Sequence, residues 1–209
     1  MKTKTLLSVF VALCLFGCKS TTGPTSSPNN FTIGDSSIYS YQTFDINGQQ
    51  GATTYDTVSI VSTNTIGGKK QFVLSNGAII VLDSNGAGTI SEYIEADLLL
   101  AYVIPSRRGD TLFKGDTIPV KIGGVVGLAM LLLTAGNPDT VITVPAGVFH
   151  TAVFDLAMIF ISDPTMRTTG KIFISPSEGI IQRESFTTEL ATKNLYLANL
   201  LQLKLLKKK

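Results

Sequence analysis

Short apolar segments separated by turn-forming residues fill the chain from residue 31 onward. Residues 57–61, 70–74 and 140–144 are rich in β-branched or aromatic side chains and alternate in part between apolar and polar positions, which is typical of strands. The turn signals between such runs are Asn47-Gly48, Gly67-Gly68, Asn76-Gly77, Asn85-Gly86, Gly109-Asp110, Asn137-Pro138-Asp139, Pro145-Ala146-Gly147, Asp163-Pro164 and Ser175-Pro176. Their regular spacing predicts a mainly β domain of antiparallel strands joined by hairpins.

One hairpin can be placed from the pattern alone. Residues 70–74 lead almost directly into Asn76-Gly77, and the apolar run 78–83 follows. Asn-Gly between two apolar runs favours a tight hairpin, because both central residues of the turn need a positive φ. We therefore predict a hairpin over residues 71–83.

Four stretches are apolar on both faces, namely residues 98–104, 125–133, 152–161 and 195–206. A strand of this kind must be covered on both faces, by a helix, a second sheet or a lipid-like ligand. We expect these stretches to line a groove for an acyl chain or an apolar segment. Residues 125–133 and the leucine-rich end are also compatible with helices, but the alternation in residues 201–205 favours a final strand.

The N-terminus has the layout of a secretory signal. Met-Lys-Thr-Lys precedes an apolar stretch from Leu6 to Phe16, and the small residue Gly17 follows it. The apolar stretch is too short to span a bilayer, which needs roughly 20 residues. Residues 1–17 are therefore expected to be a signal peptide that is removed.

The end of this signal carries a second motif. Leu15-Phe16-Gly17-Cys18 resembles the lipobox of bacterial lipoproteins, in which Leu, a variable residue and Gly or Ala precede Cys. The resemblance implies that the Cys18 thiol receives a diacylglycerol and that the new amine is acylated by a fatty acid such as palmitate, which anchors the chain firmly. Lys19 stands where Asp would resemble an inner-membrane retention signal, so the outer membrane is expected in a cell with two membranes.

The mature chain then divides into a tether and one domain. Residues 18–30 comprise the lipidated Cys and a segment without apolar side chains, which we expect to be disordered. Residues 31–209 suit a single β-rich domain. Because both cysteines are discarded or lipidated, neither a disulfide nor a thiolate metal site is expected.

Charge gives little information about partners. Without Lys2 and Lys4 of the signal, the chain has 15 basic and 15 acidic residues, and nothing indicates nucleic-acid binding. The basic run 207–209 is interpreted as a solvated tail, with contact to anionic lipid as the alternative.

Two later segments share a recognisable pattern. Residues 144–149 read Val-Pro-Ala-Gly-Val-Phe, and residues 170–184 contain Ile-Phe-Ile-Ser-Pro followed by Gly-Ile-Ile-Gln-Arg. Together they resemble uncharacterised bacterial lipoproteins of the LolA/LolB fold, although Ile172-Phe173-Ile174 stands where those proteins have an aromatic triplet. The resemblance implies a curved antiparallel sheet, half-wrapped around a hydrophobic groove as a half-open barrel. One or two covering helices are left open.

The sequence offers no strong candidate for a catalytic or metal-binding residue. His150 is the only histidine, and Thr151 and Asp155 beside it do not make a triad by sequence. We interpret it as a rim or core residue with one hydrogen bond. Residues 83–88 have the composition of a calcium loop but lack the glutamate that closes one, so a hairpin turn explains them better.

Two further motifs have structural explanations. Glu92, Glu95 and Asp97 form the only acidic cluster, and we expect them at a solvated strand edge rather than as a glycosidase pair. Gly109-Asp110-Thr111, which overlaps an Arg-Gly-Asp tripeptide, recurs at residues 115–117 and suggests two similar turns. We therefore expect no catalytic residue, cofactor or metal, and no enzyme.

The sequence favours a membrane-anchored lipoprotein with a non-catalytic binding or envelope-maintenance role. In the concrete form of this hypothesis, a groove holds an acyl chain or an apolar partner segment. The alternative is a protein-docking module of an envelope complex, which binds through an exposed sheet edge.

Overall fold

The computed structural model describes residues 31–45, 47–85, 87–95, 98–122, 125–161, 163–189 and 195–208. Cys18, the signal peptide and the tether lie outside these residues, so their predictions are not tested. Within the described residues the chain forms strands and turns, and no helix there is long and apolar enough to cross a membrane.

The strands are β1 (Ser36–Phe44), β2 (Thr54–Ile66), β3 (Lys69–Leu74), β4 (Ile79–Leu82), β5 (Gly88–Glu95), β6 (Leu98–Ile104), β7 (Thr111–Ile122), β8 (Val125–Ala135), β9 (Thr140–Val144), β10 (Gly147–Phe160), β11 (Met166–Ser175), β12 (Gly179–Glu189) and β13 (Leu195–Lys207). They form one sheet in the order β6-β5-β4-β3-β2-β1-β13-β12-β11-β10-β8-β7, with β9 paired to β10. Each pairing is antiparallel.

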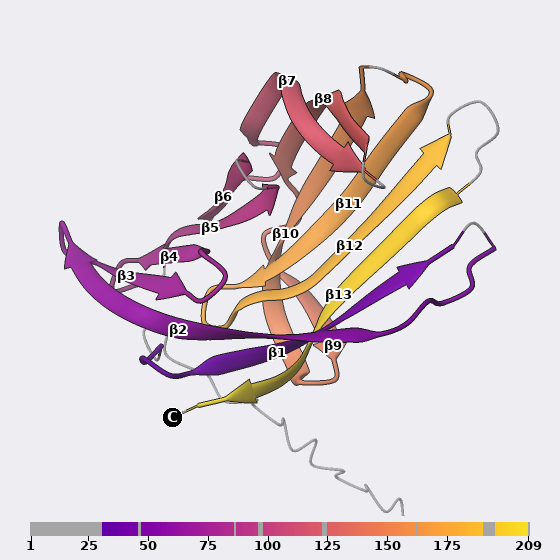
Figure 1. Cartoon of the computed structure of the whole chain (residues 1–209). Coiled ribbons are helices and arrows are strands. Elements are labelled where there is room, and N and C mark those ends of the chain that lie inside the picture. Colours follow the sequence, from indigo (N-terminus) through magenta and orange to yellow (C-terminus); the bar gives the residue numbers. More distant parts are fainter. Residues whose placement is uncertain are drawn as a thin grey trace, which may run out of the picture.

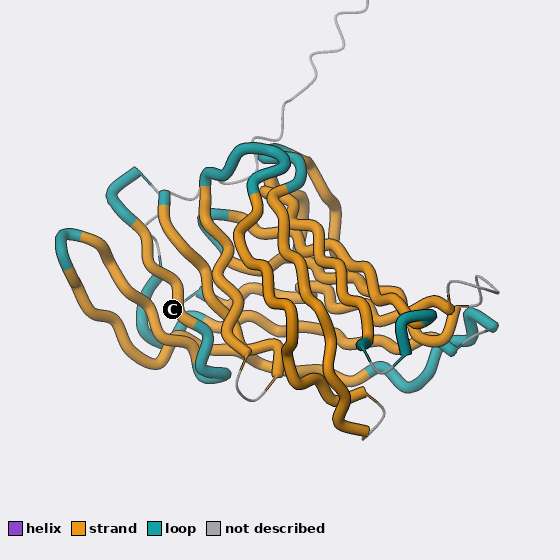
Figure 2. Tube along the Cα trace, turned by 90° about the horizontal axis from the view of Figure 1, so that it is seen from above, coloured by secondary structure: helices purple, strands orange, loops and turns teal. Residues whose placement is uncertain are grey.

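The sheet curls until it is nearly closed into a barrel. Its end strands, β6 and β7, follow each other in the sequence, and Figure 1 shows β5 and β6 beside β7 and β8. Figure 2 shows the strands wrapping around the interior, with no helix over the described part of the sheet. The predicted curved antiparallel sheet is therefore confirmed. The leucine-rich end is a strand, β13, which lies between β1 and β12 and pairs with both.

Turn chemistry explains the connections that the sequence signals. The predicted hairpin is β3–β4, where the Leu74 amide donates to the Ala78 carbonyl over 2.9 Å. Gly77 in that turn has a φ of 83°, which glycine adopts at little cost. The Asn76 side chain accepts a hydrogen bond from the Ala78 amide over 3.1 Å and fixes the turn.

Inward-facing side chains make the core. Leu100 and Tyr102 of β6, Leu131 of β8 and Phe154 of β10 are at most 1% exposed. The rings of Tyr102 and Phe154 lie 5.2 Å apart between centroids. Burial of each such side chain contributes roughly 1.5–3 kcal/mol.

The expectation that the doubly apolar strands are covered on both faces is wrong for β6 and β8. The outward side chains of Leu99 and Val103 are each 42% exposed. On β8, Leu128, Met130 and Leu132 are 38–44% exposed. Only the inward residues of these two strands are buried, so their apolar outer faces meet solvent in the described structure.

Candidate functional site

A cavity lies inside the curved sheet, between the β1–β2–β13 side and strands β4, β5 and β12. Its volume is about 120 Å³. Engineered apolar cavities of about 150 Å³ bind a benzene-sized ligand. The cavity is somewhat smaller than these, so it has room for a short alkyl segment, and a longer chain would extend through its mouth.

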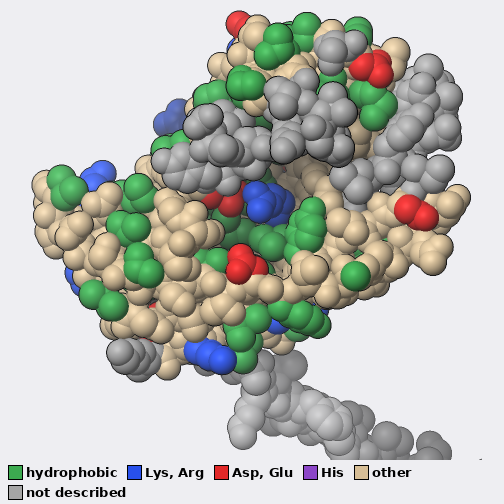
Figure 3. Space-filling model, viewed as in Figure 1, with side chains coloured by type: hydrophobic (Ala, Val, Ile, Leu, Met, Phe, Trp, Pro, Cys, Tyr) green, Lys and Arg blue, Asp and Glu red, His purple; other side chains and the backbone are tan. Residues whose placement is uncertain are grey.

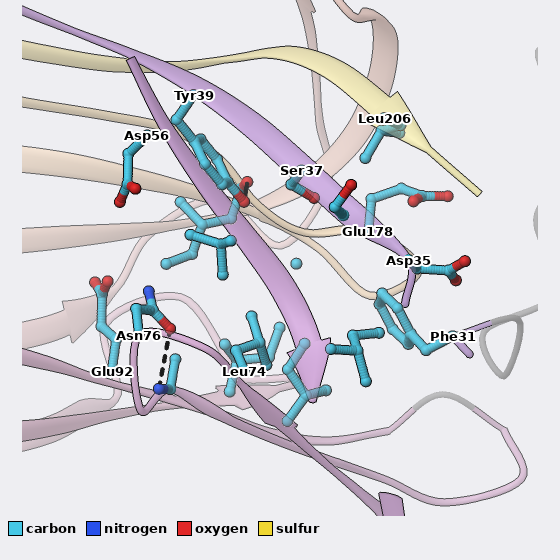
Figure 4. Close-up of a pocket in the computed structure, with 18 of the residues that line it drawn as sticks. Phe31, Asp35, Ser37, Tyr39, Asp56, Leu74, Asn76, Glu92, Glu178 and Leu206 are labelled. Carbon is cyan, nitrogen blue, oxygen red and sulfur yellow. Dashed lines mark hydrogen bonds between the residues drawn. The ribbon is translucent and has the colours of Figure 1, made fainter. Parts of the chain in front are cut away.

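Apolar side chains form the middle of the cavity wall. Val58 and Ile60 come from β2, Ile80 from β4 and Ile90 from β5, and all four are at most 6% exposed. Figure 4 shows Leu74 among these apolar side chains, with charged residues at the two ends. Alternation along the strands turns one residue in two inward, which builds this wall.

One end of the cavity holds a buried ion pair. Oε1 of Glu92 lies 3.2 Å from Nη1 of Arg183, and it also accepts a hydrogen bond of 2.8 Å from the Tyr102 hydroxyl. The Glu92 side chain is only 7% exposed and that of Arg183 32% exposed. The predicted solvated strand edge is therefore wrong for Glu92, because Arg183, far away in sequence, compensates its buried charge. The side chain of Glu95 and all of Asp97 lie outside the described residues.

Two tyrosines are held in the neutral form. Burial raises the pKa of Tyr39 to about 12. Its hydroxyl donates to the Ile180 carbonyl over 3.0 Å. Burial, together with the nearby Glu92 carboxylate, raises the pKa of Tyr102 well above its ordinary value. Both phenols therefore act as hydrogen-bond donors and add no negative charge to the cavity.

The mouth lies at this end. Asp56 is exposed on β2, directly opposite Tyr39 on β1, and both line the cavity. Figure 4 places Asp56 beside Tyr39, with Glu92 and Asn76 below them. Figure 3 shows a hollow in this face of the molecule, with acidic and basic side chains exposed inside it.

The two ends of the described chain meet at the opposite end of the cavity. Nζ of Lys208 lies 2.9 Å from Oε2 of Glu178 and 3.9 Å from Oδ2 of Asp35. It also lies 5.2 Å from the centre of the Phe31 ring, within the range of a cation–π contact. Phe31 in turn packs on Phe72, with ring centroids 5.2 Å apart. The basic C-terminus is thus partly engaged in ion pairs, whereas the sequence suggested a solvated tail.

The residues considered from sequence lie elsewhere. His150 is exposed on β10, and its Nδ1 lies 3.0 Å from Oδ1 of Asp139, so it has the single hydrogen bond expected of a rim residue. Asp155 is paired instead with Lys171, over 2.6 Å. Among the described residues, no group of three or more His, Cys, Asp or Glu is placed to hold a metal ion.

The two glycine-aspartate motifs differ in structure. Gly109-Asp110 forms the turn before β7, with a φ of 92° at Gly109, as expected. Residues 115–117 lie within β7, where the pairing with β8 shifts register between Gly115 and Ile118. The prediction of a second turn there is wrong, because the irregularity lies inside a strand. At residues 83–88, the Asn85 and Ala87 amides donate to Oδ1 of Asp83, as in a turn.

Comparisons with known proteins define the fold. No protein-family model and no curated protein matches the chain. A Bacteroides fragilis protein described as exported, with a YmcC-like fold, has a TM-score of 0.56 and 15% identity, over 85% of this chain and 97% of its own. A Parabacteroides distasonis protein described as a lipoprotein has a TM-score of 0.55 and 12% identity, over 87% of this chain and 99% of its own. At these identities the likeness establishes a shared fold with two bacterial proteins along nearly their whole length.

Proposed function

We propose that this chain is a lipid-anchored protein of the bacterial cell envelope whose β domain holds an apolar ligand segment in its interior cavity. The observation that carries the proposal is the cavity itself, with an apolar wall and a mouth lined by charged residues. Ligand sites commonly combine a mostly apolar lining with a few placed polar groups. The expected ligand is a short acyl segment or an apolar part of a partner molecule.

The envelope location is supported from two directions. The lipobox-like Leu15-Phe16-Gly17-Cys18 provides the anchor, and the two structural neighbours are described as an exported protein and a lipoprotein. Lys19 after the Cys favours the outer membrane. The resemblance of residues 144–149 and 170–184 to lipoproteins of the LolA/LolB fold, with its hydrophobic groove, agrees with a binding role rather than catalysis.

The strands that line the cavity differ from the four doubly apolar stretches that the sequence suggested. Among the described side chains of the four doubly apolar stretches, only Leu201 and Leu206 of β13 line the cavity. The remaining wall comes mainly from β1, β2, β4, β5 and β12, and β1 and β2 are less uniformly apolar than the four stretches. The proposed role therefore depends on a different set of strands.

A cavity-filling substitution tests the proposal. Ala78 is 4% exposed and lines the cavity, so Ala78→Leu should occupy part of its volume. We expect a loss of about tenfold in affinity for octanol, measured by calorimetry on the mature chain with Cys18→Ser, since roughly two lost methylene contacts are worth about 1.4 kcal/mol or more. Ala101→Leu, on the exposed outer face of β6, is the matched control and should leave the affinity unchanged. Equal affinity in both variants would contradict the proposal.

The outer face of the sheet supports a second candidate function, protein docking. Register places Leu132 of β8 opposite Ala157 of β10, Ala157 opposite Thr169, and Thr169 opposite Phe186 of β12. Leu132 and Phe186 are 38% and 40% exposed. Exposed apolar patches of this kind often mark interaction sites.

Photocrosslinking in cells separates this candidate from the first. A crosslinker at position 132 should give one stoichiometric product if the face docks a protein. The same crosslinker at position 141, where Val141 is 56% exposed, should give none. Identical patterns from both positions would argue against docking.

A further inference from the structure

The charged residues around the cavity carry an excess of negative charge. At the mouth, Asp56 and Glu92 face one cation among the residues that the structure describes, Arg183. At the opposite end, the buried carboxylates of Asp35 and Glu178 share Lys208, and Lys207 is exposed beside it. A ligand that enters through the mouth therefore meets two carboxylates and one guanidinium.

The single cation at the mouth is already engaged. Arg183 lies 3.2 Å from Oε1 of Glu92, whose side chain is 7% exposed. If a ligand carboxylate took Arg183, Glu92 would keep a buried charge with the Tyr102 hydroxyl as its remaining described partner. Leaving a buried charge unpaired is strongly unfavourable. An anionic head group is therefore disfavoured at this position.

The surroundings of Asp56, by contrast, favour a cationic head group. It is exposed, and one of its carboxylate oxygens accepts a hydrogen bond from the Thr57 amide over 2.8 Å. The ring of Tyr39 lies beside it, fixed by the hydrogen bond from its hydroxyl to the Ile180 carbonyl. A carboxylate next to an aromatic ring is a favourable environment for an ammonium group.

We propose that the cavity selects amphiphiles with a cationic amine head group, whose alkyl part contacts the apolar wall and whose ammonium lies between Asp56 and Tyr39. This inference rests on the proposed function, since it requires the cavity to accept an alkyl segment. It adds the chemical class of the ligand to that function.

Three probes with the same number of carbon atoms test the inference. Octylamine, octanol and octanoate are titrated separately into the mature chain carrying Cys18→Ser, at neutral pH and below their micellar concentrations. A hydrogen bond to a charged group is roughly twice as strong as a neutral one, so octylamine should bind about tenfold tighter than octanol. Octanoate should bind more weakly than octanol.

Asp56→Asn isolates the role of the carboxylate. The substitution should bring the affinity for octylamine down to that for octanol and leave octanol binding unchanged. Asp139→Asn is the control, because Asp139 is an exposed carboxylate that pairs with His150, and it should change neither affinity. Thermal unfolding of both variants checks that they fold.

The outcomes distinguish the inference from the function on which it rests. Octanol and octylamine bound equally, or octanoate bound most tightly, would overturn amine selection while leaving an apolar cavity site in place. Failure of all three probes to bind would overturn both. A tenfold preference for octylamine that survives Asp56→Asn would also overturn the inference.

Discussion

Arg183 of β12 and Glu92 of β5 form an ion pair of 3.2 Å across the interior of the curved sheet. The two strands are not neighbours in the sheet, so the pair links its two halves through the cavity. Tyr102 of β6 supplies a second hydrogen bond to the same carboxylate oxygen. The ion pair therefore connects two distant strands of the sheet, and both of its residues also line the candidate site.

Removal of the cation should destabilise the domain. Arg183→Met leaves the Glu92 carboxylate buried without its ion-pair partner. We expect a loss of about 2–4 kcal/mol in the free energy of unfolding, because Arg183 keeps a third of its side chain exposed and screening lowers the effect. Urea denaturation measures it. Lys171→Met, which breaks the exposed pair with Asp155, should cost less than about 1 kcal/mol.

The double variant provides a sharper measurement of the same pair. Glu92→Gln removes the charge that Arg183→Met would leave exposed to the apolar interior. The double variant should therefore lose less stability than the sum of the two single variants. Additive losses would show that the two side chains do not interact.

Alkaline pH should weaken the fold through Tyr39. Because its pKa rises from 10.0 to about 12 in the folded state, the folded chain holds this proton more tightly than the unfolded chain. The resulting stability is fully present below about pH 10 and is lost as the pH rises toward 12, by about 2–3 kcal/mol. Unfolding free energies across this range measure the loss. Tyr39→Phe should reduce the pH dependence, and an unchanged slope would contradict this assignment.

Gly88 is expected to be irreplaceable for a steric reason. A Cβ at this position would overlap the Val81 carbonyl oxygen of the neighbouring strand β4. Gly88→Ala should therefore disrupt the β4–β5 pairing beside the cavity, at a cost of about 3 kcal/mol or more. Gly68 has a φ of 78° and nothing near its missing Cβ, so Gly68→Ala should cost only about 1–2 kcal/mol. Denaturant midpoints of the two variants test the difference.

The lipobox-like motif predicts which residue carries the lipid. Cys18→Ser should stop lipid attachment and prevent labelling by a radioactive fatty acid in cells. Cys14→Ser is the matched control, since that residue lies in the expected signal peptide, and it should retain the label. Label on the Cys18→Ser chain would place the lipid elsewhere.

Local signals explain why much of the fold could be predicted. The turns at Asn76-Gly77 and Gly109-Asp110 depend on residues a few positions apart, and the structure places both between strands. The strand at residues 140–144 likewise matches β9. In each case the chemistry of a short segment determines its conformation.

The candidate site required contacts that no local pattern encodes. Glu92 looked like part of an exposed acidic cluster, because its partner Arg183 is distant in sequence. Leu132 belongs to a stretch that we expected to be covered on both faces, but the sheet leaves its outer face uncovered at this position. Which strands face the cavity follows from the order of strands in the curved sheet, and the apolar pattern alone could not provide that order.

Native mass spectrometry of the mature chain with Cys18→Ser, purified from a bacterial host without detergent, tests the central claim most directly. We predict that a fraction carries an added mass in the range of a short amphiphile or fatty acyl compound, that organic extraction removes it, and that added octanol or octylamine restores a bound species. A bare mass that takes up neither compound would contradict the claim that the interior cavity holds an apolar ligand.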